Sequence, residues 1–557
     1  MNKCVIWQIF TRHFGNPGGE NIPYGSIESN GCGKLNSYTD RVLKYFREQG
    51  ATHLWFTGLL AHASGTDYSC YGIPTCHHST VKGEAGSPYA IRDYYDIDPD
   101  LAVSVPRRNA EFNALVKRVH NAGMGFIMDF VPNHVAREYK SIRTPKGKRA
   151  LGEDDDCSKA FSPSNNFYYL PGSILGGEHD WQDYVESPAK ATGNDRFTPW
   201  PSECDWYETV KLNYGVDYGD GSHHFDTVPD TWNKMTDILL FWADRNIDGF
   251  RCDMAEMVPV EFWHYAISKV KQRYPDMLFI AEIYNPGAYR PYLEYGGFDC
   301  IYDKVGLYDT LRSVTVGYES ATAITRCWQQ TGELGNRMLH FMENHDEQRI
   351  ASDFFAGDGF KAVPAMVVSA CIDNCPVMIY AGQELGERGM DQEGFSGKDG
   401  RSTIFDYWSP DTLRRLYNCG KIDGTLLTAS ETKLQKQYST LLNICRNEKS
   451  VSHGRFFDLM YVNPISDQFN PHREYAFLRH YGNELLLVVA NFDGKEVLNG
   501  ITIPKHAFEY LGLGEYETVK FKDLLSDYTL LAPLLPDRSV RIKVPAYGAV
   551  VLKAVLQ

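Results

Sequence analysis

The stretch FIMDFVPNH at residues 126–134 is an apolar run that ends on charged and polar side chains. Three further stretches have the same form, namely GFRCD at 249–253, FIAE at 279–282 and FMENHD at 341–346. Short apolar runs of this kind are typical of strands that are buried in a parallel sheet. Because catalytic groups of parallel barrels lie at the carboxyl ends of the strands, the acids of these four stretches are predicted to converge at one mouth.

Amphipathic segments alternate with apolar runs along most of the chain, which is the pattern of parallel βα units. In the segment 109–122, for example, the apolar residues recur at intervals of three and four and form one stripe. Eight such repeats predict an α/β fold, a (β/α)8 TIM barrel, with a doubly wound sheet as the alternative. The predicted strands are 4–10, 52–56, 125–130, 247–252, 277–282, 298–302, 338–342 and 376–380, and the predicted helices include 38–49, 109–122, 231–245, 259–273 and 409–419.

Two departures from the repeat predict further domains. Residues 135–229, after the third strand, are too many for a connection in a compact domain and indicate an inserted subdomain. From residue 451 the pattern changes to period-two strands with a turn signal at Asp493-Gly494. We therefore predict a catalytic barrel of residues 1–134 and 230–450, an inserted subdomain of residues 135–229, and a C-terminal antiparallel β-sandwich domain of residues 451–557.

The composition limits the kinds of partner. The chain carries 56 Lys and Arg residues against 71 Asp and Glu residues, a net charge of −15. This balance argues against nucleic acid and anionic membrane surfaces, since both bind basic patches. The 35 Tyr, 29 Phe and 10 Trp suit a neutral sugar, on which flat amphipathic rings stack, although a large aromatic core explains most of them. No apolar stretch approaches the roughly 18 residues that a membrane span requires.

The cysteines and the N-terminus bear on the compartment. The 13 cysteines are odd in number and scattered without paired spacing. Reduced thiols in an intracellular protein are therefore expected rather than a disulfide framework. No signal peptide is visible at residues 1–10, although a removed leader replaced by a start Met would look the same. The sequence predicts a cytoplasmic protein.

The acids at the strand ends suit glycoside hydrolysis. Arg251 and Asp253 are two residues apart and point to the same side of a strand, where the guanidinium is expected to keep Asp253 ionised, as a nucleophile must be. Glu282 lies about one βα unit further on, so one carboxylate could attack the anomeric carbon while the other protonates the leaving oxygen. Any strand must meet water somewhere, but four such endings with Arg and His companions are poorly explained in this way. Metal-assisted hydrolysis is the competing use of clustered acids, and no HExxH-type ligand spacing supports it.

Together the four stretches resemble the motifs of the α-amylase family, glycoside hydrolase family 13. Residues 129–134 resemble its first motif, 249–253 the second, Glu282 the third and 344–346 the fourth, and their order matches. The resemblance covers the whole chain, with a barrel, an insertion after the third strand and a C-terminal β-domain. It implies a retaining α-glycosidase that hydrolyses α-1,4-glucosidic bonds of malto-oligosaccharides or starch-type glucans, with no cofactor required for the chemistry.

The resemblance also implies roles for individual residues. Asp253 resembles the nucleophile and Glu282 the acid/base of the family. Asp346 resembles the third acid, which distorts the bound sugar and stabilises the transition state. The residues that match sugar-binding positions are Tyr89, His134, Arg251, Glu256, His345 and Arg349, and those that match supporting positions are Asp129 and Asn133.

Several departures from the family pattern leave the specificity open. Glu256 stands where many family amylases have a Lys, which alters the acceptor side of the site. Gly86 stands where many exo-acting α-glucosidases have an Asp, whereas NHDEQR at 344–349 resembles the glucosidase version of the fourth motif. The alternatives are a transglycosylase, isomerase or phosphorylase that acts on small α-glucosides, and, less in keeping with the three acids, a non-catalytic sugar-binding relative.

A structural calcium ion is the metal that the resemblance raises. Asn133 matches a ligand of a family calcium site between barrel and insertion, and Asn213 is expected near the position of its partner, where an Asp is more usual. A second loop, ESNGCGK at 28–34, resembles another calcium loop, but Cys32 and Lys34 replace carboxylates that a hard cation prefers. The sequence therefore leaves open a calcium site at Asn133 and Asn213.

Overall fold

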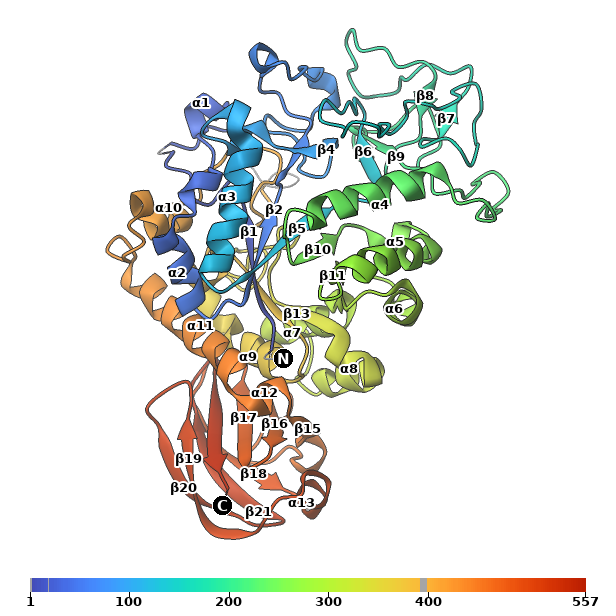
Figure 1. Cartoon of the computed structure of the whole chain (residues 1–557). Coiled ribbons are helices and arrows are strands. Elements are labelled where there is room, and N and C mark those ends of the chain that lie inside the picture. The colour runs from blue at the N-terminus through green and yellow to red at the C-terminus, as the bar shows by residue number, and fades with distance from the viewer. Residues whose placement is uncertain (1–2, 19, 391–397, 557) are drawn as a thin grey trace.

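A computed structural model describes residues 3–18, 20–390 and 398–556 of the chain. Eight parallel strands close into a barrel in the order β1-β14-β13-β12-β11-β10-β5-β2, seen at the centre of the larger body in Figure 1. The predicted (β/α)8 barrel is thereby confirmed. Its strands are β1 (Val5–Phe10), β2 (His53–Thr57), β5 (Gly125–Phe130), β10 (Gly249–Cys252), β11 (Leu278–Ala281), β12 (Cys300–Tyr302), β13 (Met338–Phe341) and β14 (Val377–Tyr380).

The barrel strands are buried on both faces. Every residue of β1, β10, β13 and β14 is buried, which explains why these strands appear in the sequence as apolar runs without strict alternation. Side chains fill the interior, so the barrel is a packed core and not a pore. The interior cluster consists of Ile6, Trp55, Ile127, Ile280, Cys300, Tyr302, Tyr308, Leu339, Phe341 and Met378.

The strand register places the predicted acids at one level. In the β5–β10 pair Arg251 lies opposite Asp129, and in the β10–β11 pair Cys252 lies opposite Ala281. Asp253 and Glu282 follow directly on these last two residues. The parallel register therefore brings the three acids to the same mouth of the barrel, as the sequence predicted.

Helices cover the outside of the barrel (Figure 1). The predicted stripe of α3 is buried against it, and α11 begins with a capping box in which Thr428 and Glu431 bind each other's backbone N–H groups. None of the helices in the described segments combines the length and apolar character needed to cross a membrane. The helices are α1 (Ile27–Asn30), α2 (Asp40–Glu48), α3 (Arg108–Asn121), α4 (Asp230–Ala243), α5 (Val260–Arg273), α6 (Pro286–Pro291), α7 (Asp309–Thr315), α8 (Ala323–Thr331), α9 (Val363–Cys371), α10 (Asp411–Tyr417), α11 (Ala429–Asn447), α12 (Lys449–Ser452) and α13 (Lys505–Leu511).

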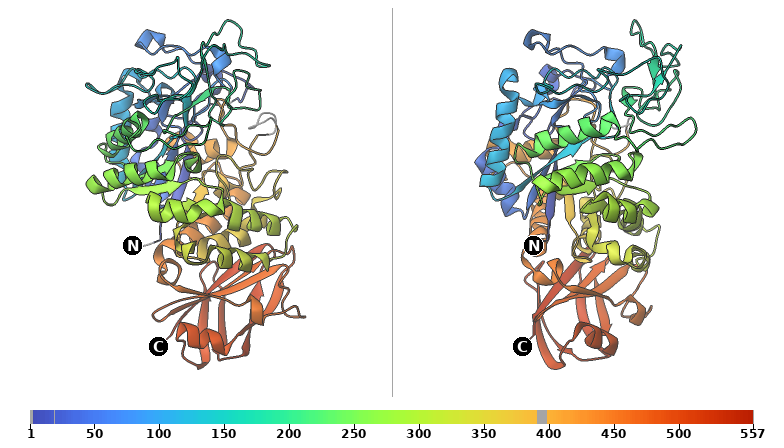
Figure 2. Two further views of the ribbon diagram at one scale, coloured as in Figure 1. Left: turned by 90° about the vertical axis from the view of Figure 1, so that its right-hand side faces the viewer. Right: turned by 45° about the vertical axis from the view of Figure 1, so that its right-hand side comes forward.

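The insertion after β5 projects from the end of the barrel that lies away from the C-terminal domain (Figures 1 and 2). It is mostly irregular and has a small aromatic core of its own, formed by Leu175, Trp181, Ala189 and Tyr207. Two short antiparallel pairs order it, β6–β9 and β7–β8. The strands outside the barrel in this half of the chain are β3 (Leu60–His62), β4 (Ile91–Ile97), β6 (His134–Ala136), β7 (Tyr169–Leu170), β8 (Ala189–Lys190) and β9 (Thr209–Lys211).

The C-terminal domain is antiparallel and all but free of helix. A six-stranded sheet in the order β15-β16-β17-β22-β19-β20 lies with a two-stranded sheet, β18-β21. Helix α9 of the barrel contacts β17 and β22, so the two bodies share an apolar interface. The strands are β15 (Arg455–Asp458), β16 (Glu474–Tyr481), β17 (Glu484–Asn491), β18 (Val497–Ile503), β19 (Tyr516–Asp523), β20 (Thr529–Leu534), β21 (Arg538–Val544) and β22 (Gly548–Val555).

Arg479 on β16 fastens the C-terminal domain to the barrel. Its side chain is buried, and burial lowers the pKa of its guanidinium. The guanidinium donates to the carbonyls of Ile372 at 2.8 Å, Gly454 at 3.0 Å and Ser450 at 3.1 Å. Because Ile372 follows α9, these bonds tie the sheet directly to a barrel helix and compensate for burying the charge.

Replacing Arg479 by Met should keep the apolar stem and remove the donors. Several buried carbonyls then lose their partner, so we expect the free energy of unfolding to fall by about 3 kcal/mol. Differential scanning calorimetry measures the accompanying fall in Tm. The exposed Arg541 of β21 is the control, since Arg541→Met should melt like the parent protein; an unchanged Tm of the Arg479 variant would contradict the assignment.

Candidate active site

Arg251, near the end of β10, gathers three acids at the barrel mouth. Its Nη1 lies 2.7 Å from Asp253 Oδ1 and 3.5 Å from Asp129 Oδ1. Its Nη2 lies 2.9 Å from Glu282 Oε2. The Arg251 side chain is fully buried, and its Nε donates to Tyr302 Oη at 3.1 Å. The acids of three neighbouring strands therefore meet at a single cation.

Backbone bonds between neighbouring strand ends hold these acids in place. Asp253 N donates to Phe130 O at 2.9 Å, and Glu282 N donates to Cys252 O at 3.1 Å. Met254, directly after Asp253, has a positive φ of 43°, a left-handed conformation that a non-glycine residue rarely adopts. Its N–H donates to Glu282 Oε2 at 2.8 Å. The strained turn after Asp253 thus orients the carboxylate of Glu282.

Tyr284 is a partner of Glu282 that the sequence analysis did not predict. Its hydroxyl donates to Glu282 Oε1 at 2.6 Å, so Tyr284, Met254 and Arg251 together engage both oxygens of the Glu282 carboxylate. A residue two positions after an acid points to the same side of an extended segment. That alternation is the signal by which Tyr284 could have been found.

Asp346 lies beside a locked histidine. Its Oδ2 is 3.2 Å from His345 Nε2, and its side chain is 32% exposed at the open mouth. The ring of Tyr89 stacks on His345 with 5.3 Å between centroids, and its hydroxyl bonds to the same Nε2. Gln8 Nε2 bonds to His345 Nδ1 at 2.8 Å. Burial and Arg251 lower the pKa of His345 well below its usual value, so this ring is neutral.

The electrostatics of the site correct one prediction from the sequence. Burial and the neighbouring Glu282 raise the pKa of Asp253 well above its usual value, against the opposing effect of Arg251. The pKa of Asp129 rises to about 7, mainly through burial. Arg251 lowers the pKa of Asp253 as expected, but it serves three carboxylates at once, and its effect does not outweigh burial and the repulsion from Glu282. Burial and mutual repulsion therefore oppose full ionisation of these carboxylates.

His134 lies at the boundary between barrel and insertion. It is buried, and its ring centroid is 5.2 Å from that of Trp206 in the insertion. Burial, together with Lys211, lowers the pKa of His134 to about 3. The imidazole is therefore neutral and could exchange hydrogen bonds with a sugar hydroxyl without carrying charge.

Two residues that were predicted to contact sugar are bonded within the protein. The carboxylate of Glu256 accepts from the N–H groups of Tyr284 at 2.9 Å and Asn285 at 3.2 Å, so it holds the loop after Glu282. Arg349 is buried, and its Nη1 donates to Glu343 Oε2 at 2.9 Å. These contacts are those of supporting residues and give the predicted sugar contacts no support.

Asn133 and Asn213, the residues of the predicted metal site, have partners within the protein. Asn133 Oδ1 accepts from Lys211 Nζ at 2.5 Å, which places an ammonium group where the cation was expected. Asn213 Nδ2 donates to Ser162 O at 2.8 Å, and its Oδ1 accepts from Gly215 N at 2.8 Å. In the segments that the structure describes, no group of three or more His, Cys, Asp or Glu residues is placed to hold a metal ion.

Other residues of the site also escaped prediction because they carry no charge signal. Trp55 Nε1 donates to Asp129 Oδ2 at 3.1 Å, although Trp55 belongs to β2 and Asp129 to β5. Gln8 reaches His345 from β1. Strands β2 and β5 are paired directly, whereas Gln8 of β1 reaches His345 because the barrel closes through the β1–β14 pair. The unpredicted residues are Gln8, Trp55, Tyr284 and Tyr302.

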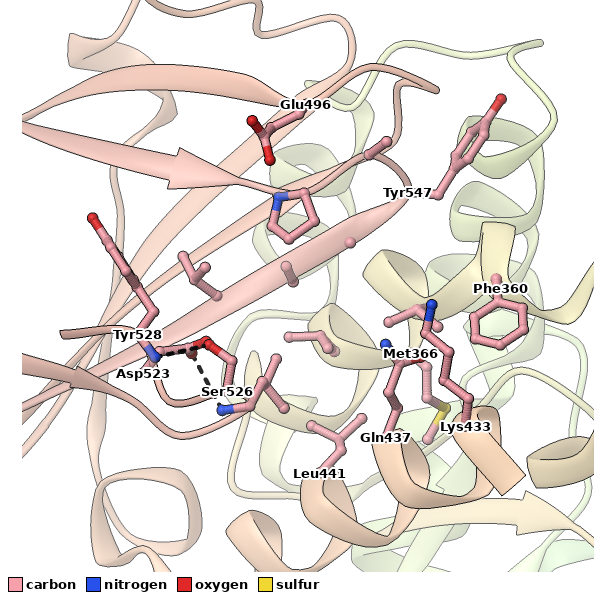
Figure 3. A pocket seen from close by; sticks show the side chains of 18 of the residues that line it. Phe360, Met366, Lys433, Gln437, Leu441, Glu496, Asp523, Ser526, Tyr528 and Tyr547 are labelled. Carbon is pink, nitrogen blue, oxygen red and sulfur yellow. Dashed lines mark hydrogen bonds between the residues drawn. The ribbon is translucent and has the colours of Figure 1, made fainter. Parts of the chain in front are cut away.

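A separate cavity of about 470 Å³ lies between helices α9 and α11 and the C-terminal domain (Figure 3). Its two acidic residues are Glu496 and Asp523. Glu496 pairs with Lys543 at 2.9 Å, and Asp523 accepts from Ser526 Oγ at 2.5 Å and Val551 N at 2.9 Å. The acids of this cavity are thus engaged separately, unlike those at the barrel mouth, which remains the candidate active site.

Residues 8–422 match the family model of the alpha-amylase catalytic domain. The chain is 25% identical over 389 residues to alpha-amylase MalA of Haloarcula japonica. This alignment covers 69% of this chain and 44% of that protein. The chain is 21% identical over 475 residues to alpha-amylase 3 of Dictyoglomus thermophilum, covering 81% of this chain and 79% of that protein. The chain therefore spans less than half the length of the first relative and most of the second.

Solved structures agree in fold along the whole chain. A maltogenic alpha-amylase, AmyB from Thermotoga neapolitana, superposes with a TM-score of 0.63 at 20% identity, covering 100% of this chain and 99% of that one. An alpha-amylase from Geobacillus thermoleovorans, complexed with acarbose, has a TM-score of 0.63 at 17% identity and covers 99% and 98%. At these identities the likeness establishes the shared fold alone. Because the family model spans most of the chain, this protein belongs to the alpha-amylase family, glycoside hydrolase family 13.

Proposed function

We propose that the protein is a retaining α-glycosidase that hydrolyses α-1,4-glucosidic bonds of malto-oligosaccharides or starch-type glucans. The observation that carries this proposal is that Asp253 and Glu282 lie against the two terminal nitrogens of one guanidinium, that of Arg251. Two carboxyls that share a guanidinium are close together. A retaining pair requires a separation of about 5–5.5 Å, whereas an inverting pair needs about 6.5–9.5 Å to admit a water molecule.

In the proposed reaction Asp253 attacks the anomeric carbon. Its Oδ1 is bonded to Arg251, which leaves Oδ2 to form the bond to the sugar. As the glycosidic bond breaks, Glu282 gives its proton to the leaving oxygen, and a covalent glycosyl-enzyme remains on Asp253. Water then attacks the same carbon and returns a proton to Glu282, and the freed Asp253 carboxylate completes the cycle.

The electrostatics of the free site set a requirement for this division of roles, because burial and Glu282 raise the pKa of Asp253, the proposed nucleophile. A pair of carboxyls can work as nucleophile and acid only if one is ionised while the other holds a proton. Burial and mutual repulsion oppose full ionisation of the cluster, and the proposed reaction requires its proton to lie on Glu282 and Asp253 to be ionised once the sugar is bound. Tyr284 holds the Glu282 carboxyl from the loop of Glu282 itself, and Met254 holds it from the turn after Asp253. Asp346, half-buried beside His345, is placed to bind hydroxyls of the same sugar.

The same glycosyl-enzyme could pass its sugar to an acceptor other than water. A transglycosylase, isomerase or phosphorylase differs from a hydrolase in this second step alone. Glu256 bears on that step, because it fixes the backbone at Tyr284 and Asn285 on the loop that follows the acid. Water, a second sugar and phosphate are therefore compared as acceptors in the test of the proposal.

Turnover of maltoheptaose tests the proposed function. We expect the purified protein to release shorter malto-oligosaccharides whose new reducing end is first in the α form, as proton NMR of the anomeric signal measures during the reaction. Parallel digests of starch, pullulan, maltose, sucrose and trehalose, with and without added glucose or phosphate, define substrate and acceptor. A first product in the β form would contradict the retaining mechanism, and no turnover of any α-glucoside would contradict the function.

Loss of either central acid should abolish turnover. Asp253→Asn removes the nucleophile and should lower kcat by roughly 10⁴-fold. Glu282→Gln removes the proton donor and should lower kcat by about 10²–10⁴-fold. Steady-state kinetics at equal folded fraction, checked by circular dichroism, measures both effects. Asp226 is an exposed acid of the insertion, so Asp226→Asn serves as the control; parental activity in Asp253→Asn would contradict the assignment.

The buried acid Asp129 should make the protein less stable as the pH rises. Its pKa is about 7 in the folded protein and about 3.9 in an unfolded chain. The folded state therefore binds more protons between these values, and stability falls as the pH increases through that window. Asp129→Asn avoids the penalty, so its Tm should exceed the parental Tm by more at pH 8 than at pH 5. Equal differences at the two pH values would contradict the raised pKa.

A further inference from the structure

Lys211 brings its ammonium group to the boundary between barrel and insertion. It is the last residue of β9 and lies opposite His134 of β6 in the antiparallel pair. The side chain is only 2% exposed, and its Nζ is 2.6 Å from Asp195 Oδ1. The same Nζ is 2.5 Å from Asn133 Oδ1 and 3.3 Å from Met257 O.

The three oxygens around Lys211 come from three separate parts of the chain. Asn133 follows barrel strand β5, Asp195 lies in the insertion, and Met257 follows strand β10. One carboxylate, one amide oxygen and one backbone carbonyl are hard donors of the kind that bind divalent cations. The ammonium donates to Asn133 Oδ1 and Met257 O and forms an ion pair with the carboxylate of Asp195, so its donors and its single positive charge suit this set of oxygens.

These residues do not fit the calcium site that the resemblance raised. A calcium ion on Asn133 and Asp195 would stand against a buried ammonium, with a single carboxylate to balance three positive charges. Calcium also prefers six to eight oxygen ligands, whereas here the oxygens already serve the lysine.

We propose that Lys211 is a built-in cation that replaces a metal ion and positions the nucleophile loop against the insertion. The oxygens it binds are close in sequence to the reacting groups. Asn133 precedes His134, and Met257 lies on the turn that begins with Asp253 and Met254. Holding these segments with one side chain makes the geometry of the mouth independent of added metal. The proposed positioning role of Lys211 rests on the proposed function of that mouth. The proposal that the lysine ammonium takes the place of a metal ion does not depend on that function.

The response of the parent protein to metal tests the cation directly. Thermal melts are recorded on the full chain after exhaustive treatment with EDTA, and again after addition of millimolar CaCl2. The result expected is the same Tm in both, within about 1 °C. A Tm that rises with calcium and falls on chelation would overturn the proposal. This measurement needs no turnover, so it stands or falls separately from the proposed glycosidase activity.

The variant Lys211→Met tests the positioning role. It keeps an apolar stem of similar length and removes the charge, so the three oxygens are left without their donor. We expect a fall in Tm of about 5 °C or more. At a temperature well below that Tm we expect kcat to fall at least about tenfold with little change in KM, because positioning acts on the reacting geometry.

Lys117→Met is the matched control, since Lys117 is an exposed residue of α3. It should keep both the parental Tm and the parental kcat. A Lys211→Met protein that melts like the parent would overturn the proposal that Lys211 stabilises the boundary between barrel and insertion. A lower Tm with an unchanged kcat would overturn the positioning role. If Lys211→Met fails to fold, the melts of the parent protein with EDTA and calcium still decide between lysine and metal.

Discussion

The whole site depends on one buried guanidinium shared by three carboxylates. Arg251 is fully buried and stands between Asp129, Asp253 and Glu282, each from a different strand end. Three negative groups around one positive group leave an excess of buried negative charge, which opposes full ionisation of the cluster and lowers its stability. Glycoside cleavage requires one carboxyl to be ionised while the other holds a proton. In the proposed function, this cluster supplies that proton.

Close packing and backbone hydrogen bonds surround this charged centre. The barrel interior is filled with large apolar side chains, and backbone hydrogen bonds between strand ends fix Asp253 and Glu282. Met254 accepts a strained conformation so that its N–H meets Glu282. The insertion is irregular and cannot hold itself in this way. Lys211 gives it a fixed point on the barrel, beside the same loop.

Much of this architecture was predictable from the sequence, for a physical reason. Parallel strands that are buried on both faces form apolar runs, and their carboxyl ends meet at one mouth, so Asp129, Asp253 and Glu282 could be brought together before any coordinates. The sequence did not predict which groups the charged side chains bind. Glu256 and Arg349 stand at the expected positions of the chain, yet their charged groups bind the protein itself. A sequence motif predicts where a residue lies along the fold, but it does not determine which group its side chain binds.

Contacts between segments that are distant in the chain could not be predicted from the sequence. The ionisation of Asp253 depends on how many carboxylates share Arg251, and the strand register decides that number. Gln8 joins the site only because the barrel closes between β1 and its neighbours. Asp195 lies in an irregular insertion without periodicity, so nothing in the sequence assigned it to Lys211.

The most direct measurement is the identity of the residue that carries the sugar. A glucosyl fluoride that carries a second fluorine on the ring would glycosylate the enzyme and then be released from it slowly. The covalent intermediate would therefore accumulate, and peptide mass spectrometry would locate the residue that carries the sugar. The account predicts one sugar adduct per chain, on the carboxylate of Asp253, and none in Asp253→Asn. An adduct on another residue, or consumption of the reagent without any adduct, would contradict the proposed mechanism.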